Sequence, residues 1–148
     1  MDTRKIKFIK IDARAVAPSL GTPYAAGADL RAICDEPVAI ESGKTVLMHT
    51  GLAMEIPEGL VGLVYARSGL ASKRGLAPAN CVGVIDSDYR GEIMVALHNH
   101  SETTQIIEHG ERVAQLVIAP YISAEYIEAD TLSDTDRGAG GFGSTGTK

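Results

Sequence analysis

A short polar segment at residues 86–91 concentrates groups that could do acid–base chemistry. It reads Asp-Ser-Asp-Tyr-Arg-Gly, so two carboxylates, a phenol and a guanidinium lie close together between strongly apolar stretches. A carboxylate such as Asp86, held within hydrogen-bond reach of a water molecule, could act as its general base. Aspartate and glycine are also ordinary residues of a hairpin turn, and this second interpretation stays open.

Two further segments could bind an anion. Residues 67–69 (Arg-Ser-Gly) lie where a predicted strand gives way to a short helix, and the free N–H groups of a helix start suit a phosphate, as does an arginine. A plain helix cap beside a surface arginine would explain the same residues. Residues 137–146 are rich in glycine and carry Arg137 and Phe142. They could close over a ligand as a lid, and an inert tail is the alternative.

The histidines and cysteines give weaker signals. His98 and His100 would share one face of a strand, but no further ligand at a telling spacing supports a metal site. We therefore interpret them as surface histidines. Cys34 and Cys81 form no CxxC pair and are expected to be reduced thiols.

The elements that must position these groups are short strands. Polar–apolar alternation and turn residues predict strands at residues 5–8, 44–49, 52–56, 60–66, 81–85, 92–97, 104–108, 112–119 and 125–128. Residues 81–85 and 92–97 are interpreted as the arms of a hairpin with the polar segment at its tip. One short helix is expected at residues 70–74, capped by Ser68 and ended by Gly75. The pattern predicts an all-β sandwich or jelly roll.

Length and composition limit the class of protein. With 148 residues, 45% of them hydrophobic and 22% charged, the chain is expected to form one globular domain. The net charge of −5 argues against binding the phosphate backbone of a nucleic acid. The longest apolar run is far shorter than the roughly 20 residues of a membrane span, and no secretory signal is apparent. We expect a cytoplasmic protein, with a domain at 1–136 and a flexible lid arm at 137–148.

Five segments, taken together and in order, carry a resemblance to a known family. They are residues 26–30 (AGADL), 67–71 (RSGLA), 83–91 (GVIDSDYRG), 110–116 (GERVAQL) and 137–146 (RGAGGFGSTG). The chain resembles the trimeric dUTP nucleotidohydrolases, or dUTPases. The resemblance implies a jelly-roll subunit and a homotrimer whose active sites each draw on all three subunits. It also implies Mg²⁺-dependent hydrolysis of dUTP to dUMP and pyrophosphate.

The resemblance assigns roles to residues of these segments. It makes Asp86 the general base for a water that attacks the α-phosphorus, and Gln115 a contact of that water or of the phosphate chain. Tyr89 would pack on the deoxyribose and exclude a 2′-hydroxyl. The remaining residues implied to bind uracil are Asn80, Gly83, Val84 and Ile85.

The phosphate and metal contacts follow from the same resemblance. Asp29 would hold Mg²⁺ through water molecules, while the triphosphate supplies direct ligands. Phe142 would cover the uracil ring. The residues implied to hold phosphates or to complete the lid are Arg67, Ser68, Gly69, Arg137, Gly143, Ser144 and Thr145.

Two departures from the family pattern and two rival functions are apparent. Ala66 stands where a proline often precedes the second motif, and Ala28 where a tyrosine often precedes the aspartate of the first. Neither position carries the expected chemistry. A dCTP deaminase would need a differently built third motif with a catalytic glutamate. A nucleotide-binding regulator on the same fold would signal through a partner, but the intact set of site residues argues against lost catalysis.

Overall fold

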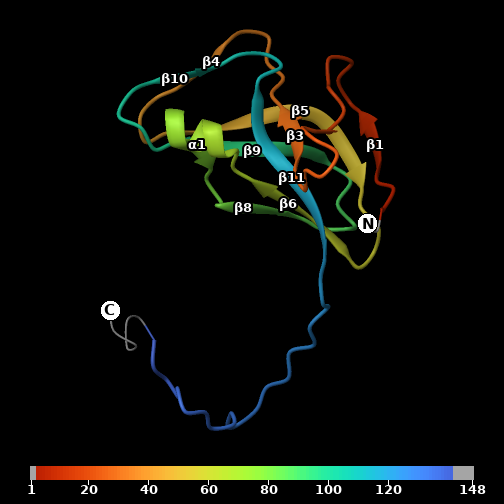
Figure 1. Cartoon of the computed structure of the whole chain (residues 1–148), viewed down its shortest axis with the longest axis vertical. Helices are drawn as coiled ribbons and strands as arrows, with labels where there is room; N and C mark the ends of the chain where they lie inside the picture. The colour runs from red at the N-terminus through yellow and green to blue at the C-terminus, as the bar shows by residue number, and fades with distance from the viewer. Residues whose placement is uncertain (1–2, 142–148) are drawn as a thin grey trace.

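The computed structural model describes residues 3–141 as a β-sandwich with one short helix (Figure 1). Phe142, Gly143, Ser144 and Thr145 lie outside the described residues, so their expected roles remain predictions. In chain order the elements are β1 (Lys7–Lys10), β2 (Ser19–Leu20), β3 (Ala28–Arg31), β4 (Val38–Ile40), β5 (Thr45–Glu55), β6 (Leu60–Tyr65), α1 (Ser68–Arg74), β7 (Leu76–Pro78), β8 (Val82–Ile85), β9 (Glu92–Asn99), β10 (Gln105–Ile107) and β11 (Arg112–Pro120). The expected all-β class with one helix is confirmed.

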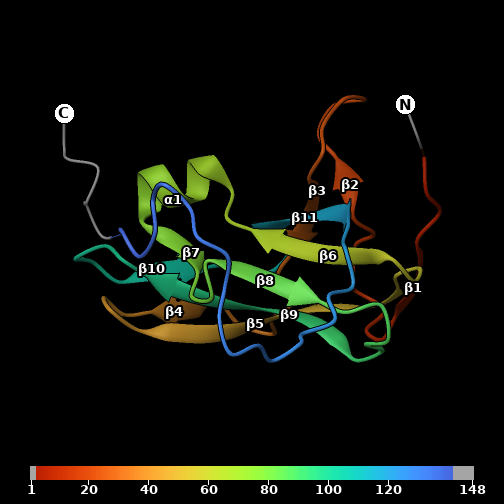
Figure 2. The same ribbon diagram turned by 90° about the horizontal axis from the view of Figure 1, so that it is seen from below.

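Two antiparallel sheets form the layers of the sandwich (Figure 2). One has the strand order β2-β3-β11-β6-β8 and the other β1-β5-β9-β7, with a small β10-β4 pair beside them. Alternate residues of β9 point inward, so that Ile93, Val95 and Leu97 are buried. They join Leu30 and Leu116 of the other sheet in one core. Each such side chain stabilises the fold by about 1.5–3 kcal/mol through burial.

The prediction of a hairpin across residues 86–91 is wrong. β8 pairs with β6 in the five-stranded sheet, whereas β9 pairs with β5 and β7 in the other. The polar segment therefore crosses from one sheet to the other at an edge of the sandwich. Alternation alone cannot show which sheet an apolar arm will join, because both sheets bury the same kind of residue.

The two strands predicted at 44–49 and 52–56 are one strand, β5, with a bulge. Its register with β9 shifts between His49 and Ala53. Gly51 lies in the bulge with φ +66°. A Cβ there would lie 2.4 Å from Ile33 Cδ1 and 3.0 Å from the Ala15 Cβ. The glycine thus allows a bulge where local sequence suggests a turn.

We expect Gly51→Ala to lower the free energy of unfolding by about 3 kcal/mol, because left-handed backbone strain and a core clash add. Gly43→Ala is the matched control. Gly43 has φ +70°, but an added Cβ would have nothing within 4 Å of it, so only the backbone strain of about 1 kcal/mol applies. Urea unfolding at one protein concentration would compare them. Equal losses in the two variants would contradict the clash.

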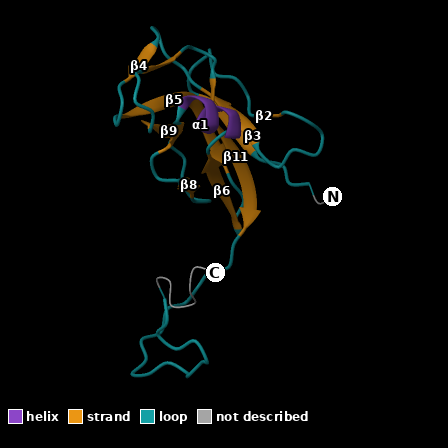
Figure 3. Cartoon of the chain, turned by 60° about the vertical axis from the view of Figure 1, so that its left-hand side comes forward, coloured by secondary structure: helices purple, strands orange, loops and turns teal. Residues whose placement is uncertain are grey.

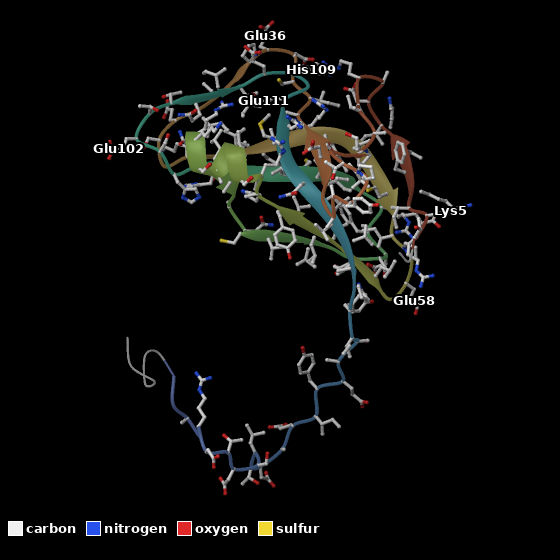
Figure 4. The ribbon with its side chains drawn as sticks, viewed as in Figure 1. Lys5, Glu36, Glu58, Glu102, His109 and Glu111 are labelled. Carbon is white, nitrogen blue, oxygen red and sulfur yellow. The ribbon has the colours of Figure 1, made fainter. Side chains whose placement is uncertain are left out.

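The helix prediction is confirmed in place but not in its cap. α1 spans Ser68–Arg74, Arg67 is the N-cap residue, and no side chain caps it. Gly75 ends the helix in the left-handed conformation, as expected. Arg74 fixes the C-terminal end: its Nε donates to Gln105 Oε1 at 3.0 Å, and its guanidinium pairs with Glu111, which is labelled in Figure 4. These contacts tie the C-terminal end of α1 to β10 and to Glu111, the residue before β11.

Several other boundaries differ from expectation. The first strand is shifted to Lys7–Lys10, and the short strands β2, β3, β4 and β7 were not predicted. No strand forms at 125–128; residues 121–141 are an extended loop that leaves the body of the molecule (Figure 3). Its large side chains Ile122, Tyr126 and Leu132 are 90% exposed or more. None of the described helices could cross a membrane.

Candidate active site

A pocket of about 300 Å³ lies between β8 and β9, where the two sheets part. Its mouth carries the polar segment, and buried apolar residues of both sheets, such as Val64 and Val95, line its interior. The pocket brings together six of the predicted site residues, namely Asn80, Gly83, Val84, Ile85, Asp86 and Tyr89. The carboxylate of Asp86 and the phenol of Tyr89 thus share the rim of one apolar cavity.

β8 supplies backbone groups to this pocket. It is the last strand of its sheet, so one side of its backbone has no strand partner in the described part of the chain. An edge strand presents a row of unpaired N–H and C=O groups. Gly83 is buried and Val84 is exposed, which places the strand at the boundary between core and solvent. The pocket can therefore offer hydrogen bonds to the edge of a flat polar ring.

Asp86 lies on the rim with its carboxylate free of side-chain partners among the described residues. Its backbone oxygen accepts the N–H of Tyr89 at 3.2 Å, which closes the turn. Arg90 wraps around the same turn, since one guanidinium nitrogen donates to the carbonyls of Ser87 and Tyr89. Asp86 also borders a second hollow that contains Glu55 and Glu58. Such an exposed, unpaired carboxylate is available to a water molecule.

A second cluster lies on the same sheet around Asp29. Its Oδ1 is 2.7 Å from Arg67 Nε and its Oδ2 is 3.1 Å from a terminal nitrogen of Arg112. Gln115 stands opposite Asp29 in the β3–β11 register and donates to the Ala66 carbonyl at 2.8 Å. Two guanidinium groups around one carboxylate leave a net positive charge, which suits an anion.

Sequence reasoning predicted Asp29, Arg67 and Gln115 but missed Arg112. Arg112 lies three residues before Gln115, within the fourth motif. Its partner Asp29 is 83 residues away in the chain, so no local pattern could reveal the pair. Ser68 and Gly69 are exposed in the first turn of α1, directly after Arg67.

Within one chain the two clusters are far apart. Asp29, Gln115, Tyr65 and Val82 form one row across β3, β11, β6 and β8. The row covers three strand spacings, and Asp86 lies four residues beyond Val82, which puts Asp29 and Asp86 roughly 20 Å apart. General-base catalysis needs hydrogen-bond reach, so one chain cannot bring both to one reacting atom.

Arg137 and the histidines stand apart from both clusters. Arg137 lies in the extended segment after β11, where its Nε donates to the Gly140 carbonyl at 2.8 Å. His98 and His100 lie side by side as expected, with ring centroids 4.4 Å apart. No group of three or more metal-binding side chains occurs in residues 3–141. Cys34 and Cys81 are free thiols.

An all-β sandwich with a small pocket, an edge strand and an arginine cluster offers the groups that a flat polar ring and an attached anion would need. Comparison with known proteins identifies the family. A family model described as dUTPase matches residues 13–146. The chain belongs to the dUTPase family.

Its relatives agree in sequence and in structure. It is 52% identical to the deoxyuridine 5′-triphosphate nucleotidohydrolase of Desulfitobacterium hafniense, covering 96% of this chain and 95% of the relative. Identity to the enzyme of the same name from Nautilia profundicola is also 52%, with 96% and 99% covered. The dUTPase of Staphylococcus bacteriophage 80alpha, solved with dUPNHPP, superposes with a TM-score of 0.84 at 28% identity, covering 98% of this chain and 100% of that one.

Proposed function

We propose that this protein hydrolyses dUTP to dUMP and pyrophosphate, with Asp86 as the general base for a water that attacks the α-phosphorus. The observation that carries this proposal is the free Asp86 carboxylate on the rim of the pocket between β8 and β9. Its relatives bear the name of this activity, and a related phage enzyme binds dUPNHPP. The reaction takes place in the cytoplasm.

The pocket accounts for the choice of nucleoside. Backbone groups of Gly83, Val84 and Ile85 at the sheet edge would pair with the polar edge of uracil, and Asn80 would add a side-chain hydrogen bond. An extended strand fits closely along a flat ring and leaves little room for the methyl group of thymine. Tyr89 at the rim would stack on the deoxyribose and exclude a 2′-hydroxyl.

The cluster around Asp29 would bind the phosphates. Arg67 and Arg112 supply charged donors, and Ser68, Gly69 and Gln115 add neutral ones. The phosphates of the substrate could bring a divalent cation to this cluster, where Asp29 is the carboxylate beside the arginines. We assign it as Mg²⁺ bound by the triphosphate, with Asp29 accepting hydrogen bonds from its waters. Bound there, the cation would neutralise phosphate charge.

A homotrimer would complete the site. The two clusters are too far apart in one chain, so the Asp29 cluster of one copy would meet the Asp86 pocket of another. The segment at 121–136 exposes Ile122, Tyr126, Ile127 and Leu132, and a neighbouring copy would cover them. Arg137 and the residues after it, from a third copy, would then form the lid over this site. Phe142 would lie on the uracil ring, and Gly143, Ser144 and Thr145 would lie near the phosphates.

The test is pyrophosphate release from dUTP and Mg²⁺, with dTTP, dCTP and UTP in parallel. We expect release from dUTP at a kcat/KM at least about 100-fold above the others. Cytosine would leave polar groups of the pocket unpaired, the methyl group of thymine would clash with β8, and the 2′-hydroxyl of UTP would clash with Tyr89. Binding of dUTP without release would point instead to a regulator. Ammonia from dCTP would point to a deaminase.

A further inference from the structure

The side chain of Glu92, at the start of β9, accepts hydrogen bonds from backbone amides of β5 that lose their backbone partner at the bulge. Its Oε1 accepts the N–H of Gly51 at 2.8 Å and that of Thr50 at 3.2 Å. These two amides lie in the bulge where the β5–β9 register is interrupted. Its Oε2 is 2.8 Å from His49 Nδ1. The carboxylate thus satisfies donors that the bulge removes from the ladder.

The carboxylate is held in its charged form. Its side chain is 19% exposed. Burial by itself would raise the pKa of Glu92, but hydrogen bonds from His49 and from the Gly51 and Thr50 amides outweigh burial, so the pKa is lowered. A charged acceptor makes stronger hydrogen bonds than a neutral one, which fixes the first residue of β9 firmly to β5.

The backbone of the same residue holds the pocket phenol. The Tyr89 hydroxyl donates to the Glu92 carbonyl at 2.9 Å, which is its one side-chain hydrogen bond with the described residues. The ring passes directly over Gly91, where a Cβ would lie 2.4 Å from the phenol oxygen. Tyr89 is otherwise 42% exposed. Its position is therefore set mainly by where Glu92 lies.

We propose that Glu92 is a positioning residue for sugar selection: by tying the start of β9 to the bulge of β5, it sets the height of Tyr89 over the ribose site. The inference rests on the proposed role of Tyr89 in excluding a 2′-hydroxyl. Glu92 lines the same pocket, but its carboxylate is engaged by the β5 bulge and by His49, so it acts on the sugar through Tyr89. A loosened Tyr89 would admit UTP while leaving Asp86 and the phosphate cluster in place.

The experiment compares kcat/KM for dUTP and for UTP in the full-length protein. We expect Glu92→Ala to lower the dUTP-to-UTP ratio about tenfold, since a misplacement of 1 Å can cost up to about 100-fold, with kcat for dUTP changed less than about threefold. Glu92→Gln, which keeps the size but not the charge, should lower the ratio less. It also serves if Glu92→Ala does not fold. Glu102→Gln is the matched control, because Glu102 and Glu58, a neighbour of Asp86, lie on opposite sides of the body of the molecule (Figure 4).

A double-variant cycle with Tyr89→Phe shows whether Glu92 acts through the phenol. Tyr89→Phe removes the hydroxyl, so adding Glu92→Ala to it should change the ratio less than about twofold further. An unchanged ratio in both Glu92 variants, or an equal loss with and without the hydroxyl, would overturn the inference and leave the proposed function intact. If Tyr89→Ala itself left the ratio unchanged, sugar selection by Tyr89 would fail, and this inference with it.

Discussion

The Asp86→Asn variant is expected to lose about 10³-fold in kcat, because an amide cannot take a proton from the attacking water and general-base catalysis contributes about 10²–10⁴-fold. The amide has the same shape as the carboxylate. The Asp86 side chain also has no hydrogen-bond partner among the described residues, so the change should not alter the stability of the fold. KM for dUTP should move less than about threefold. Single-turnover pyrophosphate release would separate the chemical step from product release.

Asp88→Asn is the matched control for this prediction. Asp88 is an exposed carboxylate in the same turn, two residues on. It lines the neighbouring hollow that contains Glu55 and Glu58, and not the pocket between β8 and β9. We expect it to keep kcat within about threefold, since loss of an exposed charge near the site changes only the local field. Near wild-type turnover in Asp86→Asn would remove Asp86 as the base. An equal loss in both variants would mean that turnover depends on the total charge of the turn, and that no single carboxylate acts as the proton acceptor.

The sequence located the polar groups of the pocket better than it predicted how the strands around them are joined. Asp86 and Tyr89 do share one pocket, as their spacing suggested. The hairpin that was to hold them does not exist, because β8 and β9 belong to different sheets. Period-two alternation records that a face is buried, and it does not record against which sheet. The pairing of β8 and β9 with different sheets is what forms the pocket, since its walls come from both layers.

Long-range ion pairs were the other feature hidden from the sequence. β3 was not predicted, because alanine and aspartate are unfavourable in strands and make up half of its four residues. In the fold this carboxylate is neutralised by Arg67 and Arg112, 38 and 83 residues away. The bulge at Gly51 was hidden for the same reason: its amides are satisfied by Glu92, 41 residues later. Such partners are set by topology, which local propensity does not contain.

Arg67→Ala is expected to lower kcat/KM for dUTP by about 10²–10³-fold, the usual cost of removing one donor aimed at developing charge. The loss has two parts, since a guanidinium is removed from the phosphates and Asp29 is left with Arg112 alone beside them. Lys73→Ala removes a positive charge from the last turn of the same helix, far from the N-cap, and should stay within about twofold. If Lys73→Ala matched Arg67→Ala, net charge and not the position of Arg67 would explain the loss.

Mixing the two inactive variants tests whether one site is built from different copies. Asp86→Asn chains carry an intact Asp29 cluster, and Arg67→Ala chains carry an intact Asp86 pocket. If each site takes these parts from different copies, random assembly at equal ratio gives about a quarter of sites with both parts intact, because the contact is head-to-tail. We therefore expect pyrophosphate release to recover to about a quarter of the wild-type rate after the variants are unfolded together and refolded. Mass spectrometry of intact complexes would confirm that mixed trimers form. Mixed trimers without recovered activity would mean that each site takes Arg67 and Asp86 from the same chain, and the roughly 20 Å between the clusters would then have to be closed by movement within that chain.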